Sequence, residues 1–332
     1  MNFRELTLRL GTAGLITALA LGILSGPPLS GAEQARRPYR IGVLHRGYFP
    51  NNPSVEGLKA GLKAAGLAEG RDLTFDVHFT RGSLQGVPVG AAALAKTGAD
   101  LIFVDSEEAA RAAMAATQTI PIVFIQVGDP VAAGIVKEIA HPGGNITGVS
   151  NLATELVPKR LEALKIIVPA LRRVWVVYHA DERSSLAAVR KAREVVSSLK
   201  LELVARPVRS TEELTGQLKG VRAGDGLLPP AARTLNIPGL MLDLVLFGRV
   251  PAVFDSAFWV QAGGLVAYGS EENADGFQAA RLVAKVLRGA RPQDLPVEGA
   301  NKIELAINLK TAKSLGITIP REIIFRADKV IE

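Results

Sequence analysis

From residue 39 onward the chain alternates short apolar runs with longer stretches in which apolar positions recur at helical spacing. The run 39–44 is followed by 54–65, where Val55, Leu58 and Leu62 stand at i, i+3 and i+7. A β-rich run, a loop of small residues and a helical stretch together make one βαβ unit. The pattern therefore predicts an α/β protein built on parallel sheets.

Nearly continuous apolar strands support this prediction, because the strands of parallel sheets are buried on both faces. The predicted strands are 39–44, 73–79, 101–104, 122–125, 174–178, 201–204, 226–228, 251–254, 265–268 and 302–308. The predicted helices are 54–65, 89–96, 107–117, 130–140, 155–168, 184–199, 211–221, 235–247 and 274–288. A further short helix and the segment 317–320 close the chain.

The βαβ pattern restarts after residue 150, which predicts two Rossmann-like lobes with parallel sheets. Between the halves, 142–150 is rich in turn residues and is expected to be the first crossing from one lobe to the other. The C-terminal stretch is too short for a core of its own and has to return to an existing lobe. The expected division is 38–148 plus 265–295 for the first lobe and 149–264 plus 296–332 for the second, joined by a multi-crossing hinge.

The N-terminus has the three parts of a secretory signal peptide. Arg4 and Arg9 precede an apolar run over 10–24, and small residues at 30–32 predict cleavage before Glu33. A retained membrane anchor is the alternative, but the apolar run is shorter than the ~20 residues that a spanning helix needs. We therefore expect residues 1–32 to be removed. The chain has no cysteine for a lipid anchor or a disulfide, so the mature protein is expected to be free in the periplasm.

The charge pattern argues against nucleic acid as a partner, although the formal net charge is +7. Basic residues are interleaved with acidic ones at 181–183 and 191–194, as on solvated helix faces. No basic run alternates with the aromatic side chains on which single-stranded nucleic acid stacks.

Sequence signatures of the common hydrolases and of ATPases are missing. The chain contains neither a Gly-x-Ser-x-Gly elbow, nor His-Glu-x-x-His, nor a Walker loop. Its histidines, His45, His78, His141 and His179, stand apart in the sequence. A pairing of His45 with His179 across the cleft remains open, but we expect no enzyme, no cofactor and no metal.

Several stretches of the chain, taken in order, give a resemblance to a known family. They are 41–44, 120–124, 127–131, 141–150, 262–269, 295–298 and 307–316, and the match is loose over 208–247. On these residues the chain resembles the ABC transporter substrate-binding proteins of the tryptophan/tyrosine type. The resemblance implies a type I periplasmic-binding-protein fold, and we expect a monomer. It also implies capture of a small-molecule ligand, often an amino acid, for a permease in the inner membrane that a separate ATPase powers.

Ligands of open α/β sheets bind beyond the carboxyl ends of the strands, where loops lead into helix N-termini. The residues at these positions are the candidate ligand-binding residues: Arg46, Tyr48, Asp105, Ser106, Gln126, Asp129, Asn151, Tyr178, His179, Asp255, Ser256 and Phe258. Such a cleft suits a zwitterion. Arg46 or Ser106 would bind a carboxylate, the aspartates an ammonium, and the aromatic residues an apolar or aromatic side chain.

Several candidates have structural alternatives. Ser106 and Asp129 could simply cap helices, Tyr178 could be a core residue, and Trp259 is expected to pack. The leading prediction for the ligand is an aromatic or branched amino acid. A periplasmic sensor partner of a membrane receptor and a periplasmic hydrolase are the alternative functions, whereas a sugar-repressor-like regulator would need a helix-turn-helix in place of residues 1–32.

Overall fold

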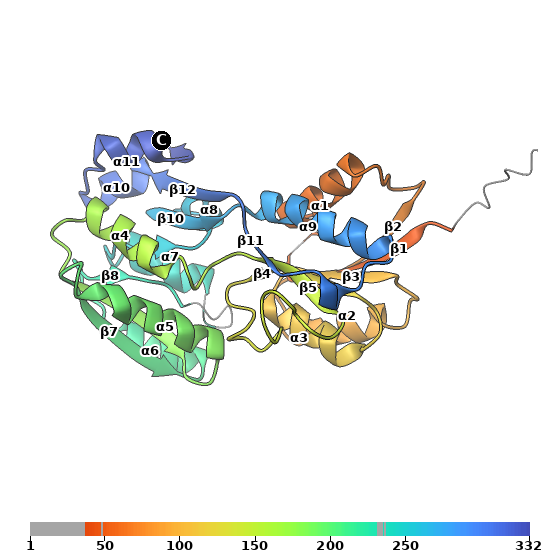
Figure 1. The fold of residues 1–332 in the computed structure, drawn as a ribbon. Helices are drawn as coiled ribbons and strands as arrows, with labels where there is room; N and C mark the ends of the chain where they lie inside the picture. The colour runs from red at the N-terminus through yellow and green to blue at the C-terminus, as the bar shows by residue number, and fades with distance from the viewer. Residues whose placement is uncertain (1–36, 48, 231–234, 236) are drawn as a thin grey trace, which may run out of the picture. The chain divides into compact units, whose positions relative to one another are not determined.

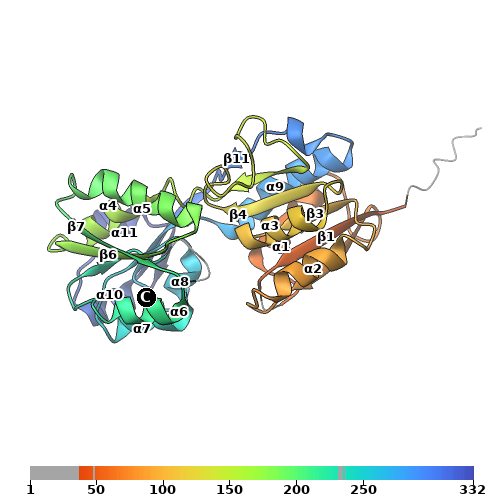
Figure 2. The ribbon, with the colours of Figure 1, turned by 90° about the horizontal axis from the view of Figure 1, so that it is seen from below.

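The computed structural model describes residues 37–47, 49–230, 235 and 237–332. Residues 38–332 form one compact unit, which contains two lobes of sheet and helix (Figures 1 and 2). The signal peptide predicted at 1–32 and the candidate Tyr48 lie outside the described residues. The α/β class and the two-lobed architecture predicted from the hydrophobic pattern are confirmed.

The first lobe is built on a six-stranded sheet in which all strands run parallel. Ile41 and Val43 point to one face and Leu44 to the other, and all three are fully buried. Burial on both faces explains the uninterrupted apolar runs. The strand order is β11 (Glu298–Gly299), β5 (Ile146–Ser150), β4 (Ile122–Val127), β3 (Leu101–Val104), β1 (Tyr39–His45) and β2 (Leu73–Phe79).

Two pairs of helices cover this sheet. On one face α1 (Pro53–Ala64) packs along α9 (Glu272–Leu287), and on the other lie α2 (Gly86–Leu94) and α3 (Glu107–Ala116) (Figures 1 and 2). Because α9 belongs to the last fifth of the chain, the first lobe is completed only by a C-terminal segment.

The second lobe has a sheet in two parts, which a parallel bridge between Leu227 and Ala252 joins. One part has the order β7 (Glu202–Val208), β6 (Arg173–His179), β8 (Gly226–Leu227). The other has the order β9 (Val253–Phe254), β10 (Val266–Ser270), β12 (Ile303–Asn308), β13 (Lys329–Ile331). Its helices are α4 (Val157–Ile167), α5 (Arg183–Val196), α6 (Thr211–Leu218), α7 (Pro238–Leu246), α8 (Ala257–Gln261), α10 (Leu309–Leu315) and α11 (Arg321–Arg326).

One strand of the second lobe departs from the predicted parallel order. β12 runs antiparallel to β10, with Ile303 opposite Ser270. The chain returns from the first lobe beside the carboxyl end of β10, where the N–H of Glu271 donates to the carbonyl of Lys302. A strand that starts at that end has to run back along its neighbour.

The chain passes between the lobes after β5, between β10 and α9, and between β11 and β12. All three passages differ from the predicted boundaries. The first was expected within 142–150, but Ile146–Ser150 is β5 of the first-lobe sheet, so the chain crosses only after residue 150. β10, expected in the first lobe with 265–295, pairs in the sheet of the second, and β11, expected in the second with 296–332, pairs with β5. A run of four apolar residues fits either sheet equally well, and a two-residue strand has no periodicity to recognise.

The helix predicted over 130–140 does not form. Its first turn begins, with the carbonyl of Asp129 accepting from the N–H of Ala133, but Gly134 adopts φ +70° and ends it. The short elements α8, α11, β11 and β13 were not predicted, and the segment 317–320 is neither helix nor strand.

Candidate ligand-binding site

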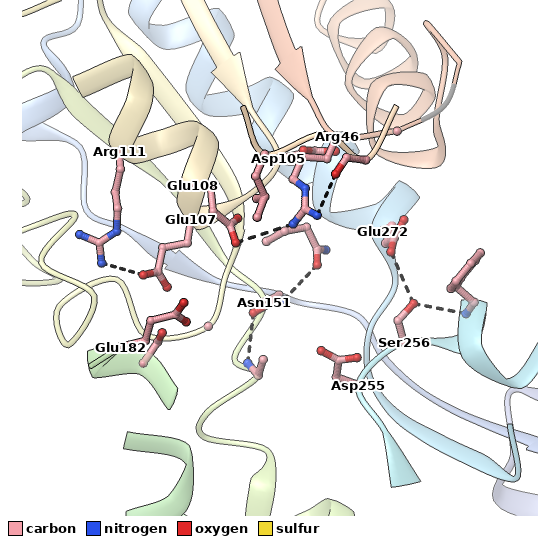
Figure 3. A pocket seen from close by; sticks show the side chains of 18 of the residues that line it. Arg46, Asp105, Glu107, Glu108, Arg111, Asn151, Glu182, Asp255, Ser256 and Glu272 are labelled. Atoms are coloured by element: carbon pink, nitrogen blue, oxygen red, sulfur yellow. Dashed lines mark hydrogen bonds and ion pairs between the residues drawn. The ribbon is translucent and has the colours of Figure 1, made fainter. Parts of the chain in front are cut away.

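A pocket of about 980 Å³ is lined from both lobes. Figure 3 shows that Arg46, Asp105, Glu107 and Glu108 come from the first lobe, whereas Asp255 comes from the second. The other lining residues are Gly47, Asn52, Gly82, Ser83, Leu84, Gln85, Arg111, Gln126, Gly128, Asn151, Ala153, Thr154, Asp181, Glu182, Arg183, Ser184, Ile237, Ser256, Phe258, Trp259 and Glu272.

The predicted candidates that line this pocket all follow a strand directly or after a short loop. They are Arg46 after β1, Asp105 after β3, Gln126 at the end of β4, Asn151 after β5, and Asp255, Ser256 and Phe258 after β9. The rule that ligands bind beyond the carboxyl ends of strands brings them together because the strands concerned end on the side of each sheet that faces the pocket.

Other predicted candidates do not line the pocket. Ser106 is fully buried and caps α3, where its Oγ accepts from the N–H of Ala109 at 3.2 Å. Asp129 Oδ1 accepts from the N–H of Ala132 at 2.9 Å, so it too serves as a cap. Tyr178 packs against the core of the second lobe, and His179 Nδ1 accepts from the N–H of Asp181. The capping and core alternatives describe the contacts of Ser106, Asp129 and Tyr178.

Arg46 is held at the first-lobe wall by an ion pair and a backbone contact. Its Nη1 lies 3.7 Å from Glu108 Oε1, and its Nη2 donates to the carbonyl of Gly82 at 3.3 Å. The buried Nε has no hydrogen-bond partner among the described residues. Arg111 is paired more closely, with Nη2 2.7 Å from Glu107 Oε1. Arg46 has the longer ion pair, so it retains a greater capacity than Arg111 to bind an anionic group; Arg183 is the third arginine of the lining.

Asp105 is positioned by the loop that leads into α1. Asn52 Nδ2 donates to Asp105 Oδ2 at 3.0 Å, while Asn52 Oδ1 caps the helix by accepting from the N–H of Val55. His45 is fully buried beside them, and its Nδ1 accepts from the N–H of Gly47 at 3.1 Å. Neither His45 nor His179 lines the pocket, so the geometry gives no support to a catalytic pair.

Gln126 lines the pocket from an unusual backbone position. It has φ +57°, in the left-handed region that non-glycine residues rarely adopt, and β4 and β5 shift register between Phe124 and Val127. Bulges of this kind redirect a side chain next to a site. The redirected amide donates from Nε2 to Asp275 Oδ2 at 2.7 Å, and its Oε1 accepts from Asn151 Nδ2 at 2.9 Å.

Asp275, in the first turn of α9, is a buried carboxylate behind this wall. Its side chain is 1% exposed, and Ser270 Oγ donates to Oδ2 at 2.5 Å. Burial raises the pKa of Asp275 to about 7 against the effect of the Ser270 hydrogen bond, and the negative charges of Glu272 and Glu271 add to the rise. This carboxyl group therefore titrates near neutral pH.

The second-lobe wall combines polar and aromatic groups. Ser256 caps α8 by accepting from the N–H of Phe258 at 3.3 Å, and its Oγ lies 3.4 Å from Glu272 Oε1 (Figure 3). The Phe258 ring is 55% exposed although it lines a pocket. Trp259 is nearly buried and stacks on Phe254 with ring centroids 4.9 Å apart, so the predicted packing role holds, even though part of it reaches the pocket.

Several charged residues of the pocket were not predicted as ligand-binding residues. Glu272 follows the carboxyl end of β10, where the same rule would have found it if β10 had been assigned to the second lobe. Glu108 and Arg111 lie one and four residues beyond Glu107 on α3, which a helical projection of its first turns could have indicated. Glu182 and Arg183 begin α5, and no signal in the sequence singles them out.

Neither a metal centre nor a membrane-spanning helix is found in the part of the chain that the structure describes. Within the described ranges, no group of three or more His, Cys, Asp or Glu side chains is arranged to hold a metal ion. In the same part of the chain, no helix has the length and apolar character needed to cross a membrane.

Two α/β lobes that share a pocket at their strand ends define a type I periplasmic-binding-protein fold. A family model for ABC transporter substrate binding proteins matches residues 51–331. The chain belongs to this family, so it is a substrate-binding protein of the ABC transporter type. The resemblance found from the sequence is thereby confirmed.

Relatives of the chain support this assignment. A tyrosine-binding protein of Clostridioides difficile (strain R20291) is 26% identical over 321 residues, which cover 91% of this chain and 92% of that protein. The structure of an ABC domain from Streptococcus pneumonia in complex with L-Trp is 26% identical and covers 89% of this chain and 100% of its own, with a TM-score of 0.76. A conserved domain protein from Vibrio cholerae is 28% identical, covers 88% and 99%, and has a TM-score of 0.78.

Proposed function

We propose that the protein captures an amino acid with an aromatic side chain between its lobes and delivers it to an ABC permease in the inner membrane, which a separate ATPase powers. In this proposal the protein is a periplasmic monomer, exported by a cleaved signal peptide, and it releases its ligand chemically unchanged. A branched aliphatic amino acid is the second ligand class that the pocket would accept.

The single observation that carries the proposal is the pairing of an exposed aromatic ring with charged groups in one pocket. Phe258 is 55% exposed where it lines the pocket, and Ile237 and Leu84 also line it. An apolar surface inside a polar pocket suits a ligand with one apolar and one charged end. Relatives described as binding tyrosine and L-Trp support the same ligand class.

The charged ends of a zwitterion have partners on both walls. Arg46 lines the pocket, and among the described residues its terminal nitrogens are held only by a 3.7 Å ion pair with Glu108 and a 3.3 Å contact to the carbonyl of Gly82, which leaves the guanidinium able to bind a carboxylate. The lining contains seven acidic side chains against three arginines, an excess that favours a ligand with an ammonium group. We assign the carboxylate to Arg46 and the ammonium to Asp255, which lies on the opposite lobe (Figure 3).

Binding across two lobes explains how capture would be signalled to a permease. A ligand that contacts Arg46 on one lobe and Asp255 on the other binds more tightly when the lobes are closed, and this difference in affinity shifts the hinge equilibrium. A ligand bound to one lobe alone would not shift it.

Isothermal titration of ligand-stripped protein (33–332) tests the proposal. The panel contains L-tryptophan, L-tyrosine, L-phenylalanine and L-leucine, with tryptamine and indole-3-propionate as controls that lack one charged end. We expect saturable binding of the aromatic amino acids and at least about a hundredfold weaker binding of both controls, since each control leaves either Arg46 or Asp255 without its ligand partner. Binding of the controls as tight as that of L-tryptophan would contradict the zwitterion, and failure of every amino acid would refute the proposal.

Mass spectrometry of the released ligand completes the test. Recovery of an unchanged amino acid after prolonged incubation is expected, and any turnover would favour the hydrolase alternative.

A further inference from the structure

The amide groups of Gln126 and Asn151 have a fixed direction in the pocket wall. Asn151 Oδ1 accepts from the N–H of Ala153 at 3.1 Å, so its Nδ2 faces Gln126 Oε1, and Gln126 Nε2 in turn faces Asp275. Gln126, Asn151 and Ala153 all line the pocket. These hydrogen bonds form a series that ends at the carboxylate of Asp275. Because this carboxylate accepts from Gln126, it fixes which atom of each amide is the donor.

Asp275 itself is anchored where the chain passes between the lobes. Ser270, the last residue of β10 in the second lobe, donates to the same carboxylate oxygen that accepts from Gln126 of the first lobe. The other oxygen, Oδ1, is buried and has no hydrogen-bond partner among the described residues. Asn151 lies on the first passage between the lobes, so the series Ser270, Asp275, Gln126, Asn151 links two of the passages.

We infer that Asp275 is a positioning residue of the pocket, which orients the side-chain amides of Gln126 and Asn151 and holds them firmly only while it is ionised. An ionised Asp275 accepts hydrogen bonds and cannot donate, so it permits one orientation of the Gln126 amide. A protonated Asp275 could donate to Gln126 Oε1, which would turn both amides and set Asn151 Nδ2 against the N–H of Ala153. Two donors would then face each other, and the wall would lose a hydrogen bond.

Burial first, and then the charged groups that face Asp275, determine the pH at which this change occurs. Glu271 and Glu272, at the start of α9, raise the pKa of Asp275 further above the value that burial produces. Glu271 is paired in turn with Lys302, whose Nζ lies 3.7 Å from Glu271 Oε2. The contacts from β4 and β10 are the uncharged Gln126 and Ser270. With a pKa of about 7, Asp275 changes charge across the neutral range.

The expected effect of pH on ligand affinity rests on the proposed function. The orientation held by ionised Asp275 is the one that shapes the pocket in this structure. We therefore expect binding to tighten by about tenfold as pH rises from 6 to 8, the effect of one hydrogen bond restored.

The first experiment needs no ligand and no variant of Asp275. The side-chain amide resonances of Gln126 and Asn151, assigned from the spectra of Gln126→Ala and Asn151→Ala, are followed from pH 5.5 to 8.5 in ligand-free protein. Both are expected to shift together with one midpoint near neutral pH. Resonances that stay constant across this range would overturn the inference, whatever the protein binds.

The second experiment separates the inference from the proposed function. Dissociation constants of L-tryptophan and L-tyrosine are measured at pH 6 and 8 for wild type, Asp275→Asn and the control Asp243→Asn, which makes the same change at an exposed position of α7. Wild type and Asp243→Asn should show the tenfold change, and Asp275→Asn should not. A change that persists in Asp275→Asn would overturn the coupling to affinity. Titrating amides without binding of either amino acid would support the positioning role and refute the proposed ligand class.

Discussion

Gly57 of α1 and Asn273 of α9 lie so close together that a Cβ at position 57 would stand 2.8 Å from the carbonyl carbon of Asn273. Gly61 repeats the relationship one turn later, where a Cβ would stand 2.7 Å from the carbonyl oxygen of Phe277. Small residues at this spacing let the two helices approach backbone to backbone, and this contact attaches α9 to the first lobe.

Substitution of Gly57 by Ala should weaken that attachment. The new methyl group overlaps backbone atoms, which cannot move as a flexible side chain can, so we expect a loss of about 1–3 kcal/mol in the free energy of unfolding. Gly216→Ala is the matched control, because a Cβ there meets nothing within 4 Å and Gly216 lies in α6. The control should gain up to about 1 kcal/mol. Chemical denaturation measures both, and equal effects would contradict the close packing.

Removal of the Phe258 ring should reduce binding of the proposed ligand. Phe258→Ala takes away exposed apolar surface inside the pocket, and we expect affinity for L-tryptophan to fall by at least about tenfold, with little change in stability. Phe247→Ala is the control, because Phe247 is 81% exposed and does not line the pocket. Calorimetry on both variants decides, and a similar loss in the two would argue against a contact between Phe258 and the ligand.

Asp225 should stabilise the second lobe in a way that depends on its charge. Burial tends to raise the pKa of Asp225, but hydrogen bonds from Arg173, the N–H of Arg222 and the indole of Trp175 together lower it below its ordinary value of 3.8. A lowered pKa means that the stabilisation is complete above pH 3.8 and is lost as pH falls through the folded-state value. Asp225→Asn should therefore cost about 2–3 kcal/mol at pH 7 and progressively less in acid.

A surface pair provides the comparison for Asp225. Asp294 is also bound by two nitrogens of one arginine, Arg291, but its side chain is 52% exposed. Asp294→Asn should change the free energy of unfolding by less than about 1 kcal/mol. Denaturation curves at pH 7 and at a pH well below 3.8 test both variants, and a loss at Asp225 that is the same at the two pH values would contradict the role of its charge.

Asp275 should have the opposite effect on stability. Its pKa is raised to about 7 in the folded protein, so between pH 3.8 and 7 the folded state binds more protons than the unfolded state. The contribution of Asp275 to stability therefore declines as pH rises through this window and is constant above it. The melting temperature of Asp275→Asn relative to wild type should increase by several degrees from pH 4.5 to 8. A difference that stays flat, or that also appears in Asp243→Asn, would contradict the raised pKa.

The N-terminus gives a prediction outside the described residues. Expression of the full chain with its signal peptide should yield a periplasmic protein that begins at Glu33, which N-terminal mass spectrometry detects directly. A membrane-bound product that retains Arg4 and Arg9 would instead support the anchor alternative.

The sequence predicted the central strands well because a strand that is buried on both faces needs an uninterrupted apolar run wherever it lies in the sheet. Val43 and Val123 had to be strand residues, and so the loops that follow them had to meet. The sequence predicted the structure less well where pairing between distant strands decides which sheet a strand joins. No local signal in the sequence assigns β10 to one lobe or the other. Glu272 was therefore missed, although it lies beyond the carboxyl end of a strand as Asp255 does.

Residues that cap helices or turns cannot be distinguished from pocket residues by their position in the sequence. Ser106 and Asp129 stand at helix or turn starts just as pocket residues do, and only the structure shows that their oxygens face their own backbone N–H groups. The orientation of Gln126 could not be predicted at all, because it depends on a bulge and a left-handed backbone that no residue type requires.

The attachment of α9 to α1 also has a consequence for the order in which the protein can fold during synthesis. The N-terminal lobe starts at residue 38, yet one layer of its core is absent until the ribosome has made residues 272–287. Until then the apolar face of α1 and of the strands beneath it has no cover. The first lobe therefore cannot complete its fold until nearly the whole polypeptide has been synthesised. A nascent chain of intermediate length keeps apolar surface exposed, to which chaperones can bind.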